Sequence, residues 1–311
     1  MNPSAQVGPQ PGNRNGKFFY GWVLVGLGFF VQFVVMGTMI QSFPVFLLPL
    51  AEEFGTSRAE AALPTVAIMG AGLIFSPMIG MAVTRFPIRN VMLFGATVMI
   101  AGFYFLSQAT AFWQIVLIYG IAGPTALSAL GAISCSSLMV NWFERKRALA
   151  LGIAMMGMSI SGAVLIPLST WGVEHWGWRG VYQAFAVSGL ALMPPIAWFV
   201  VTRPSDMGLA QDGDAIPAIQ EGPGLAAPIP LRSVRALLFS PILWGVAAAC
   251  GLGFFGGIAV MNHGMAFAVD RGIAPMRAAG LLSAISVVRS DMFGARAPSA
   301  PAPEKRPRSQ K

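Results

Sequence analysis

The sequence predicts an all-α integral membrane protein. Of its 311 residues, 55% are hydrophobic and only 10% are charged, whereas soluble domains carry about 25% charged residues. The charged residues are also clustered, and they leave uncharged runs at least as long as the roughly 20 residues that a transmembrane helix needs. These runs are Phe18–Ala51, Ala61–Thr84, Asn90–Phe143, Ala148–Val173, Gly180–Thr202 and Ala236–Val269.

The runs predict seven spans, because Asn90–Phe143 is long enough for two helices with a break near Ser107–Thr110. A further uncharged run, Ala278–Val288, reaches only about halfway across the hydrocarbon. We therefore expect five regions in chain order. They are a disordered cytoplasmic tail (1–16), a bundle of six helices (17–202), a cytoplasmic linker rich in Pro and Gly (203–235), the start of a second bundle (236–288) and a disordered basic tail (289–311).

The basic residues indicate the orientation. With the N-terminus in the cytoplasm, inside segments hold Arg14, Lys17, Arg85, Arg89, Arg145, Lys146, Arg147, Arg203, Arg232 and Arg235, and outside segments only Arg58, Arg179, Arg271 and Arg277. This is the positive-inside bias, and we expect a multi-pass protein of the plasma membrane. The net charge of +8 is therefore a topology signal that favours a lipid bilayer over nucleic acid as the partner, with anionic lipid heads as a secondary possibility.

An internal repeat links the first and seventh spans. The segment AEEFGTSRAEAA (51–62) aligns without gaps with AVDRGIAPMRAA (268–279), and both follow the outer end of an odd-numbered span. The repeat indicates that span 7 restarts the pattern of span 1. Parallel six-helix halves of this kind build one major class of secondary transporter.

The loop between spans 2 and 3 reads GMAVTRFPIRNVM from residue 80. It resembles the signature of the major facilitator superfamily, Gly-x-Leu-x-Asp-Arg-x-Gly-x-Arg-[Arg/Lys]. Gly80, Arg85 and Arg89 match, while the pattern's Asp is Thr84 and its second Gly is Pro87. The resemblance implies a conformational gating loop that holds helix ends of the two halves together, with one charged partner missing. The alternative is that the arginines are only topology charges.

Two further stretches resemble the monocarboxylate-porter and oxalate/formate-antiporter-like branches. NWFERKRALALGIAMMGMSISGAVLIPL (141–168) is similar to their fourth loop and fifth helix, and GWRGVYQAF (177–185) to the start of their sixth helix. Glycines allow membrane helices to approach closely. We therefore expect the fifth helix to pack through Gly152, Gly157, Gly162 and Pro167.

The resemblance implies a six-helix N-terminal bundle of the major-facilitator type, plus helix 7 and part of helix 8, in a chain truncated at its C-terminal end. The implied function is secondary transport of a small organic anion, a mono- or dicarboxylate, by alternating access, with a coupling proton or a counter-anion as the second partner. Because alternating access needs two halves, we expect this chain alone to transport poorly or not at all.

We expect polar side chains from three spans to line a substrate cavity near the membrane midplane. Thr38 and Gln41 are three residues apart and share a helix face, and Pro124 predicts a kink in span 4. Each candidate is also explained by a hydrogen bond between helices. The candidates are Gln32, Thr38 and Gln41 in span 1, Tyr119 and Ser128 in span 4, and Asn262 and His263 in span 7.

No enzyme motif is present, and we expect no catalytic residue, cofactor or metal site. The two histidines, His175 and His263, are far apart in sequence, and both cysteines, Cys135 and Cys250, lie within expected spans. Two other function classes stay open. One is a seven-span receptor or sensor, which would place its N-terminus outside, and the other is a half-transporter that acts through self-association.

Overall fold

The computed structural model describes residues 19–213 and, beyond them, residues 240–241, 244–245, 248–249, 251–252, 264, 267–269, 271–274 and 276–280. In order, its named elements are α1 (Gly21–Met36), the π-helix η1 (Gly37–Gln41), α2 (Phe43–Phe54), α3 (Arg58–Ala61), α4 (Leu63–Arg85), α5 (Ile88–Ser107), α6 (Phe112–Leu130), α7 (Ala132–Trp142), α8 (Arg147–Phe199) and the short turns η2 (Pro204–Met207) and η3 (Gln211–Gly213). Both expected tails and most of the expected linker and second bundle lie outside these residues.

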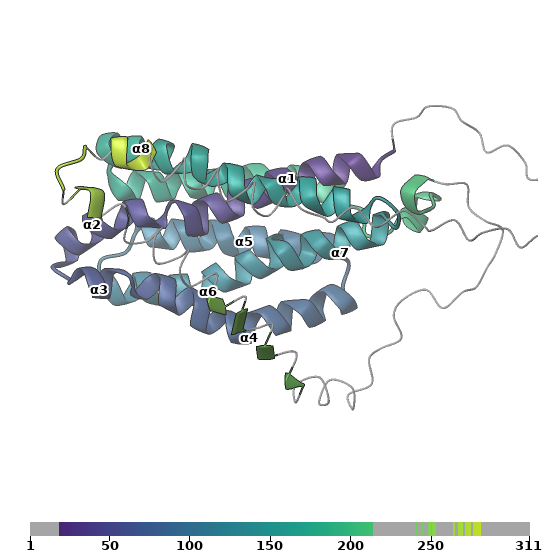
Figure 1. Ribbon diagram of the computed structural model, residues 1–311, viewed down its shortest axis with the longest axis horizontal. Coiled ribbons are helices and arrows are strands. Elements are labelled where there is room, and N and C mark those ends of the chain that lie inside the picture. The colour runs from purple at the N-terminus through teal and green to yellow at the C-terminus, as the bar shows by residue number, and fades with distance from the viewer. Residues whose placement is uncertain are drawn as a thin grey trace, which may run out of the picture.

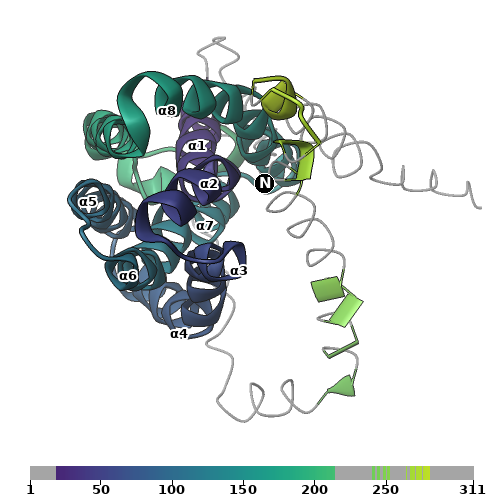
Figure 2. The same cartoon turned by 90° about the vertical axis from the view of Figure 1, so that its left-hand side faces the viewer.

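The helical passes lie side by side along the long axis of the bundle (Figures 1 and 2). Within the described residues, five helical segments are long and apolar enough to cross a membrane: Gly21–Phe54, Ala59–Arg85, Ile88–Ser107, Phe112–Trp142 and Arg147–Phe199. The last forms two passes, because Gly177 leaves helical geometry with φ 69° and ψ 168°. Only glycine adopts that conformation readily. The six spans expected before the linker are therefore confirmed.

The bundle has two ends. We call the end with Glu53 the Glu53 end and the opposite end the Trp142 end. Helix α8 begins and finishes at the Trp142 end, where the Tyr20 hydroxyl donates to the Phe199 carbonyl at 2.8 Å. It turns at the Glu53 end, where Arg179 contacts Glu53. The chain therefore enters and leaves the six-helix bundle at the same end.

Small residues bring α1 and the first pass of α8 together. A Cβ on Gly157 would lie 2.1 Å from the Phe29 carbonyl oxygen, and one on Gly37 would lie 2.9 Å from the Ser161 Cβ. Lipid-embedded helices associate through this kind of close backbone approach. The other expected packing residues of this helix differ from Gly157. Gly162 is buried, Pro167 lies inside the continuous helix, and a Cβ on Gly152 would meet nothing within 4 Å.

Helix α4 forms the least buried pass. Only 11% of its most apolar stretch of 18 residues is buried. Its outward side chains are nevertheless apolar, and Leu73 is 80% exposed. A soluble protein rarely exposes such a patch, whereas a helix in lipid does so routinely. The exposure of α4 therefore agrees with a membrane-embedded bundle.

The internal repeat is present in the backbone geometry. The Thr56 N–H donates to the Ala51 carbonyl at 3.1 Å, and the Ile273 N–H donates to the Ala268 carbonyl at 3.1 Å. The residue before each donor is a glycine with positive φ, 60° and 80° respectively. Both copies thus end a helix with the left-handed glycine cap that the aligned sequences share.

Candidate functional site

The middle of the first pass is not α-helical. Between α1 and α2, residues Gly37–Gln41 form the π-helix η1, and the Ser42 N–H donates to the Gly37 carbonyl five residues earlier at 2.9 Å. Pro44 gives a local reason, because its ring nitrogen cannot donate to the Ile40 carbonyl of a regular helix. Such π-turns are frequent at functional sites.

Two predicted cavity residues lie in η1. The Thr38 side chain is buried and its hydroxyl donates to the Val34 carbonyl at 2.7 Å, while Gln41 is half-buried. Just after them, the Ser42 hydroxyl accepts a hydrogen bond from the Ser169 hydroxyl of α8 at 3.0 Å. Polar groups therefore gather where the first pass departs from α geometry and crosses α8.

Gln32 lies one to two turns before η1 and is fully buried. Its amide nitrogen donates to the Met155 sulfur at 3.0 Å. Its Oε1 has no hydrogen-bond partner in the described part of the chain. That oxygen lies 3.5 Å from the place of a Cβ on Gly131, where span 4 is interrupted between α6 and α7.

Span 4 is interrupted at Gly131, seven residues after the kink expected at Pro124. Helix α6 continues through Pro124, and the break lies at Gly131, with φ −81° and ψ −140°. A Cβ on Gly131 would lie 2.0 Å from the Leu127 carbonyl oxygen, so this geometry excludes any other residue without a backbone shift. The proline is tolerated because membrane helices can satisfy the freed carbonyl by local adjustments.

The span 4 candidates take part in contacts between helices. The hydroxyls of Tyr119 and Tyr182 are 3.1 Å apart and both residues are fully buried, while the hydroxyls of Ser128 and Ser76 are 2.9 Å apart. The Tyr119 ring also packs edge-on against Phe43, with centroids 5.2 Å apart, and so lies beside the residue that follows Ser42. The span 7 candidates, Asn262 and His263, lie outside the described residues.

The predicted gating loop lies at the Trp142 end. Arg89 donates to the Ala197 carbonyl at 3.3 Å, which joins the start of α5 to the end of α8 within the same bundle. Arg85 is exposed, and a Cβ on Gly80 would meet nothing within 4 Å. Thr84 donates its hydroxyl to the Met81 carbonyl of its own helix at 2.7 Å.

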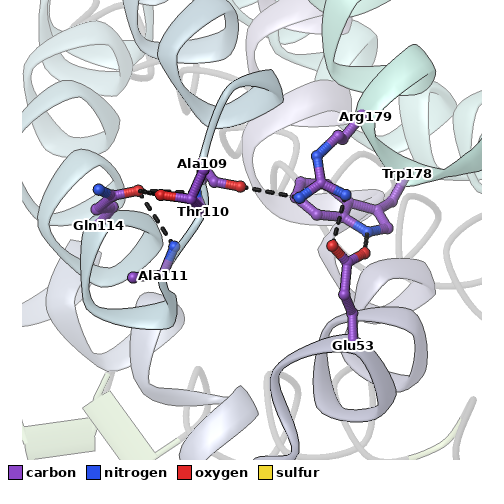
Figure 3. A network of polar contacts seen from close by, with 7 residues as sticks. All are labelled: Glu53, Ala109, Thr110, Ala111, Gln114, Trp178 and Arg179. Carbon is purple, nitrogen blue, oxygen red and sulfur yellow. Dashed lines mark hydrogen bonds and ion pairs between the residues drawn. The ribbon is translucent and has the colours of Figure 1, made fainter.

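A charged network joins three passes at the Glu53 end (Figure 3). The Glu53 carboxylate accepts hydrogen bonds from the Trp178 indole N–H and from the Arg179 guanidinium. Arg179 also donates to the Ala109 carbonyl in the α5–α6 turn at 2.9 Å, and its guanidinium carbon lies 4.1 Å from the centre of the Trp178 ring. The turn at Gly177 places the side chains of Trp178 and Arg179 next to Glu53.

The comparison with known families decides the class of protein. A family model described as Major Facilitator Superfamily matches residues 24–297, which is most of the chain. The chain belongs to the Major Facilitator Superfamily. It is therefore a multi-pass membrane protein of a transporter family and not an enzyme. The match favours transport over the receptor alternative.

The relatives of this superfamily member include named carboxylate transporters. It is 28% identical over 279 residues to monocarboxylate transporter 13 of Bos taurus, covering 88% of this chain and 60% of that protein. It is 30% identical over 198 residues to monocarboxylate transporter 3 of Rattus norvegicus, covering 63% of this chain and 39% of that protein. The chain thus spans about 60% or less of the length of these curated relatives.

A solved structure shows the same fold. The match is a bacterial homolog of the human lysosomal transporter Spinster in an inward-facing and unoccupied conformation, with a TM-score of 0.67 and 15% sequence identity. It covers 90% of this chain and 61% of that one. At this identity the likeness concerns the major-facilitator fold alone.

Sequence reasoning missed several of the polar contacts in this major-facilitator bundle. Glu53 and Arg179 are 126 residues apart, and of the two only Arg179 was interpreted, as a topology charge. The available signal was their position. Glu53 lies just after one apolar run and Arg179 just before another, both at the outer side of the expected membrane. Ser42 and Ser169 carried no comparable signal, since single serines are common in membrane helices.

We expect the Glu53–Arg179 pair to stabilise the Glu53 end. The side chains are 38% and 41% exposed, which limits the ion pair itself to about 1 kcal/mol. In a double-mutant cycle with Glu53→Gln and Arg179→Gln, we expect a coupling energy of about 1 kcal/mol in the free energy of unfolding in detergent. The exposed neighbour Glu52→Gln is the control. A coupling energy near zero would show that the two side chains act independently.

Proposed function

We propose that this chain takes part in moving a small organic anion, a mono- or dicarboxylate, across the plasma membrane by alternating access. Membership of the superfamily implies secondary transport. The names of its relatives support a carboxylate as the substrate class. A coupling proton or a counter-anion completes the cycle.

The observation that carries the proposed binding site is the π-helix η1, midway along the first pass. Interrupted membrane helices offer backbone and side-chain groups to substrates near the midplane. Here the Gln41 amide is a donor, and the hydroxyls of Thr38 and Ser42 become donors once they leave the Val34 and Leu165 carbonyls. Neutral donors in a low-dielectric site suffice to bind a carboxylate, because hydrogen bonds to charged acceptors are strong there.

Gln32 supports the same location. A buried carbonyl oxygen without a partner costs about 1–3 kcal/mol, and Gln32 Oε1 has no partner among the described residues. Such a group calls for a specific reason, such as a functional role or a bound water or ion. We infer that Gln32 faces the substrate or its water shell when the bundle opens.

We propose that the Trp142 end faces the cytoplasm. The exposed basic residues of the six passes concentrate there, whereas Arg179 at the Glu53 end is paired with a carboxylate. This asymmetry supports the positive-inside orientation. The exposed basic residues at that end are Arg85, Arg89, Arg145, Lys146, Arg147 and Arg203.

Ligand-induced thermal stabilisation of the purified chain tests the substrate class. A ligand at one hundred times its Kd stabilises the folded state by about 2.7 kcal/mol, or roughly 5–10 °C in Tm at this size. We expect lactate, pyruvate or succinate to raise Tm in a saturable way, and lactamide, the neutral isostere of lactate, to leave it unchanged. Equal shifts with lactate and lactamide, or no shift with any carboxylate, would contradict the proposal.

A further inference from the structure

The chain does not leave the bundle freely after α8. Four groups from three other passes hold its exit at the Trp142 end. Trp142 donates its indole N–H to the Val201 carbonyl at 2.9 Å, and Asn141 donates its amide to the Thr202 carbonyl at 3.1 Å. The remaining two bonds join the Tyr20 hydroxyl to the Phe199 carbonyl and the Ile88 N–H to the Thr202 hydroxyl.

The next eleven residues, 203–213, fold back on the bundle as η2 and η3, and we call them the strap. Its far end is held by Asp212. One carboxylate oxygen accepts from the N–H groups of Glu144 and Arg145 at 3.0 and 2.7 Å, and the other accepts from Lys146 N–H at 3.4 Å. Gln211 adds a bond from its amide to the Asn141 carbonyl at 3.1 Å.

Asp212 therefore binds the backbone N–H groups of the three residues that lead into α8, from 66 to 68 residues away. The N-cap residue of α8, Lys146, has no side-chain capping bond of its own. Only the Lys146 N–H belongs to the helix N-terminus, where N–H groups lack partners within the helix and carry partial positive charge, so a carboxylate is favoured there. The strap thus supplies a contact that the α7–α8 loop lacks locally.

The backbone at Asp212 is adapted to this contact. Its φ is 56°, in the left-handed region, and no other non-glycine residue of the described chain has a positive φ. Such a conformation costs an L-residue roughly 1 kcal/mol, and aspartate tolerates it better than most. The contact is also solvent-exposed. A strained residue with exposed bonds makes a docking contact that can open without disturbing the core.

Asp212 stays ionised in this contact. Partial burial alone would raise its pKa, but the N–H groups of Arg145, Glu144 and Lys146 and the Arg145 charge outweigh that effect and hold the pKa below its usual range. A lowered pKa gives docking that is complete above the ordinary aspartate value and is lost as pH falls through the lowered one. The contact therefore persists throughout the neutral range.

We propose that the strap is a releasable latch that sets the length of the connection leaving the six-helix bundle. With Asp212 docked, the connection begins at Gly213. With Asp212 released, it begins at Arg203, and ten more residues add up to about 36 Å of reach. Release also frees the α7–α8 loop, which carries the basic triplet Arg145–Arg147. The latch lies beyond the proposed substrate site and does not depend on it.

Limited trypsin digestion of the purified full chain tests the latch, because the docked loop contains three trypsin sites, Arg145, Lys146 and Arg147. Asp212→Gly removes the carboxylate while keeping the left-handed conformation unstrained. We expect it to speed the first cuts at these sites about tenfold, and Asp212→Asn to give a smaller increase. The control is Asp206→Ala, because Asp206 accepts from Arg203 N–H within the strap itself, at 3.1 Å.

Hydrogen exchange on the wild-type chain gives a second readout that needs no variant. We expect the amides of residues 144–146 to exchange at least tenfold more slowly than an unstructured loop, with that protection unchanged between pH 6 and pH 8. The latch is overturned by unprotected amides in the wild type, by Asp212→Gly cleavage within twofold of wild type, or by equal acceleration in Asp206→Ala.

Discussion

Gly157→Ala is expected to separate α1 from α8 and to cause a large loss of stability. The new Cβ would lie 2.1 Å from the Phe29 carbonyl oxygen, 2.9 Å from the Phe29 carbonyl carbon and 3.1 Å from the Phe33 nitrogen. These are backbone atoms, so no rotamer change relieves the contact. Overpacking typically costs about 1–3 kcal/mol, and we expect the upper part of that range, or roughly 6–12 °C in Tm.

The matched control lies on the same helix. Gly152→Ala places its Cβ where nothing lies within 4 Å. Alanine is also preferred over glycine inside a helix by about 1 kcal/mol. We therefore expect Gly152→Ala to leave Tm unchanged or to raise it. Similar losses in both variants would mean that the α1–α8 contact is not the close backbone approach described above.

Gln32→Met is expected to raise stability and lower substrate affinity together. Methionine has nearly the same shape, and it removes a buried oxygen that has no partner in the described residues. Because such an oxygen costs about 1–3 kcal/mol, we expect the free energy of unfolding to increase by about 1 kcal/mol. If Gln32 contacts the carboxylate or its water shell, we expect Kd to rise about tenfold.

Ser134→Ala separates the two effects. The Ser134 hydroxyl is also buried without a partner among the described residues, and it belongs to α7 rather than to the proposed site. We expect the same gain in stability with an unchanged Kd. A Gln32→Met variant that is less stable than wild type, or that binds carboxylate equally well, would remove Gln32 from the proposed site.

The passes and their ends could be predicted from the sequence because lipid imposes a local rule. A span needs about 20 apolar residues in a row, and charged clusters mark its ends. The break between α5 and α6 falls at residues 108–111, where Gln108 and Thr110 interrupt the apolar run. The left-handed helix caps of the repeat could be predicted from the aligned glycines, Gly55 and Gly272.

Contacts between passes could not be predicted in this way. The pairs Glu53–Arg179 and Asp212–Arg145 join residues far apart in sequence, and their partners depend on how each helix is rotated. The break at Gly131 lies away from Pro124 because a proline can be accommodated in a membrane helix, whereas the Gly131 backbone allows no side chain. Local patterns carry no information on either point.

The most direct test of the proposed site is the accessibility of η1 to water and substrate. In a chain with Cys135→Ala and Cys250→Ala, a membrane-impermeant methanethiosulfonate cation would be applied to Gln41→Cys and to Leu73→Cys, which replaces the most exposed large hydrophobic residue of α4. Thiolates react and thiols in hydrocarbon do not. We predict that Gln41→Cys is labelled, that a bound carboxylate slows labelling while lactamide does not, and that Leu73→Cys stays unlabelled. An unreactive Gln41→Cys, or labelling that no carboxylate slows, would contradict a substrate site at η1.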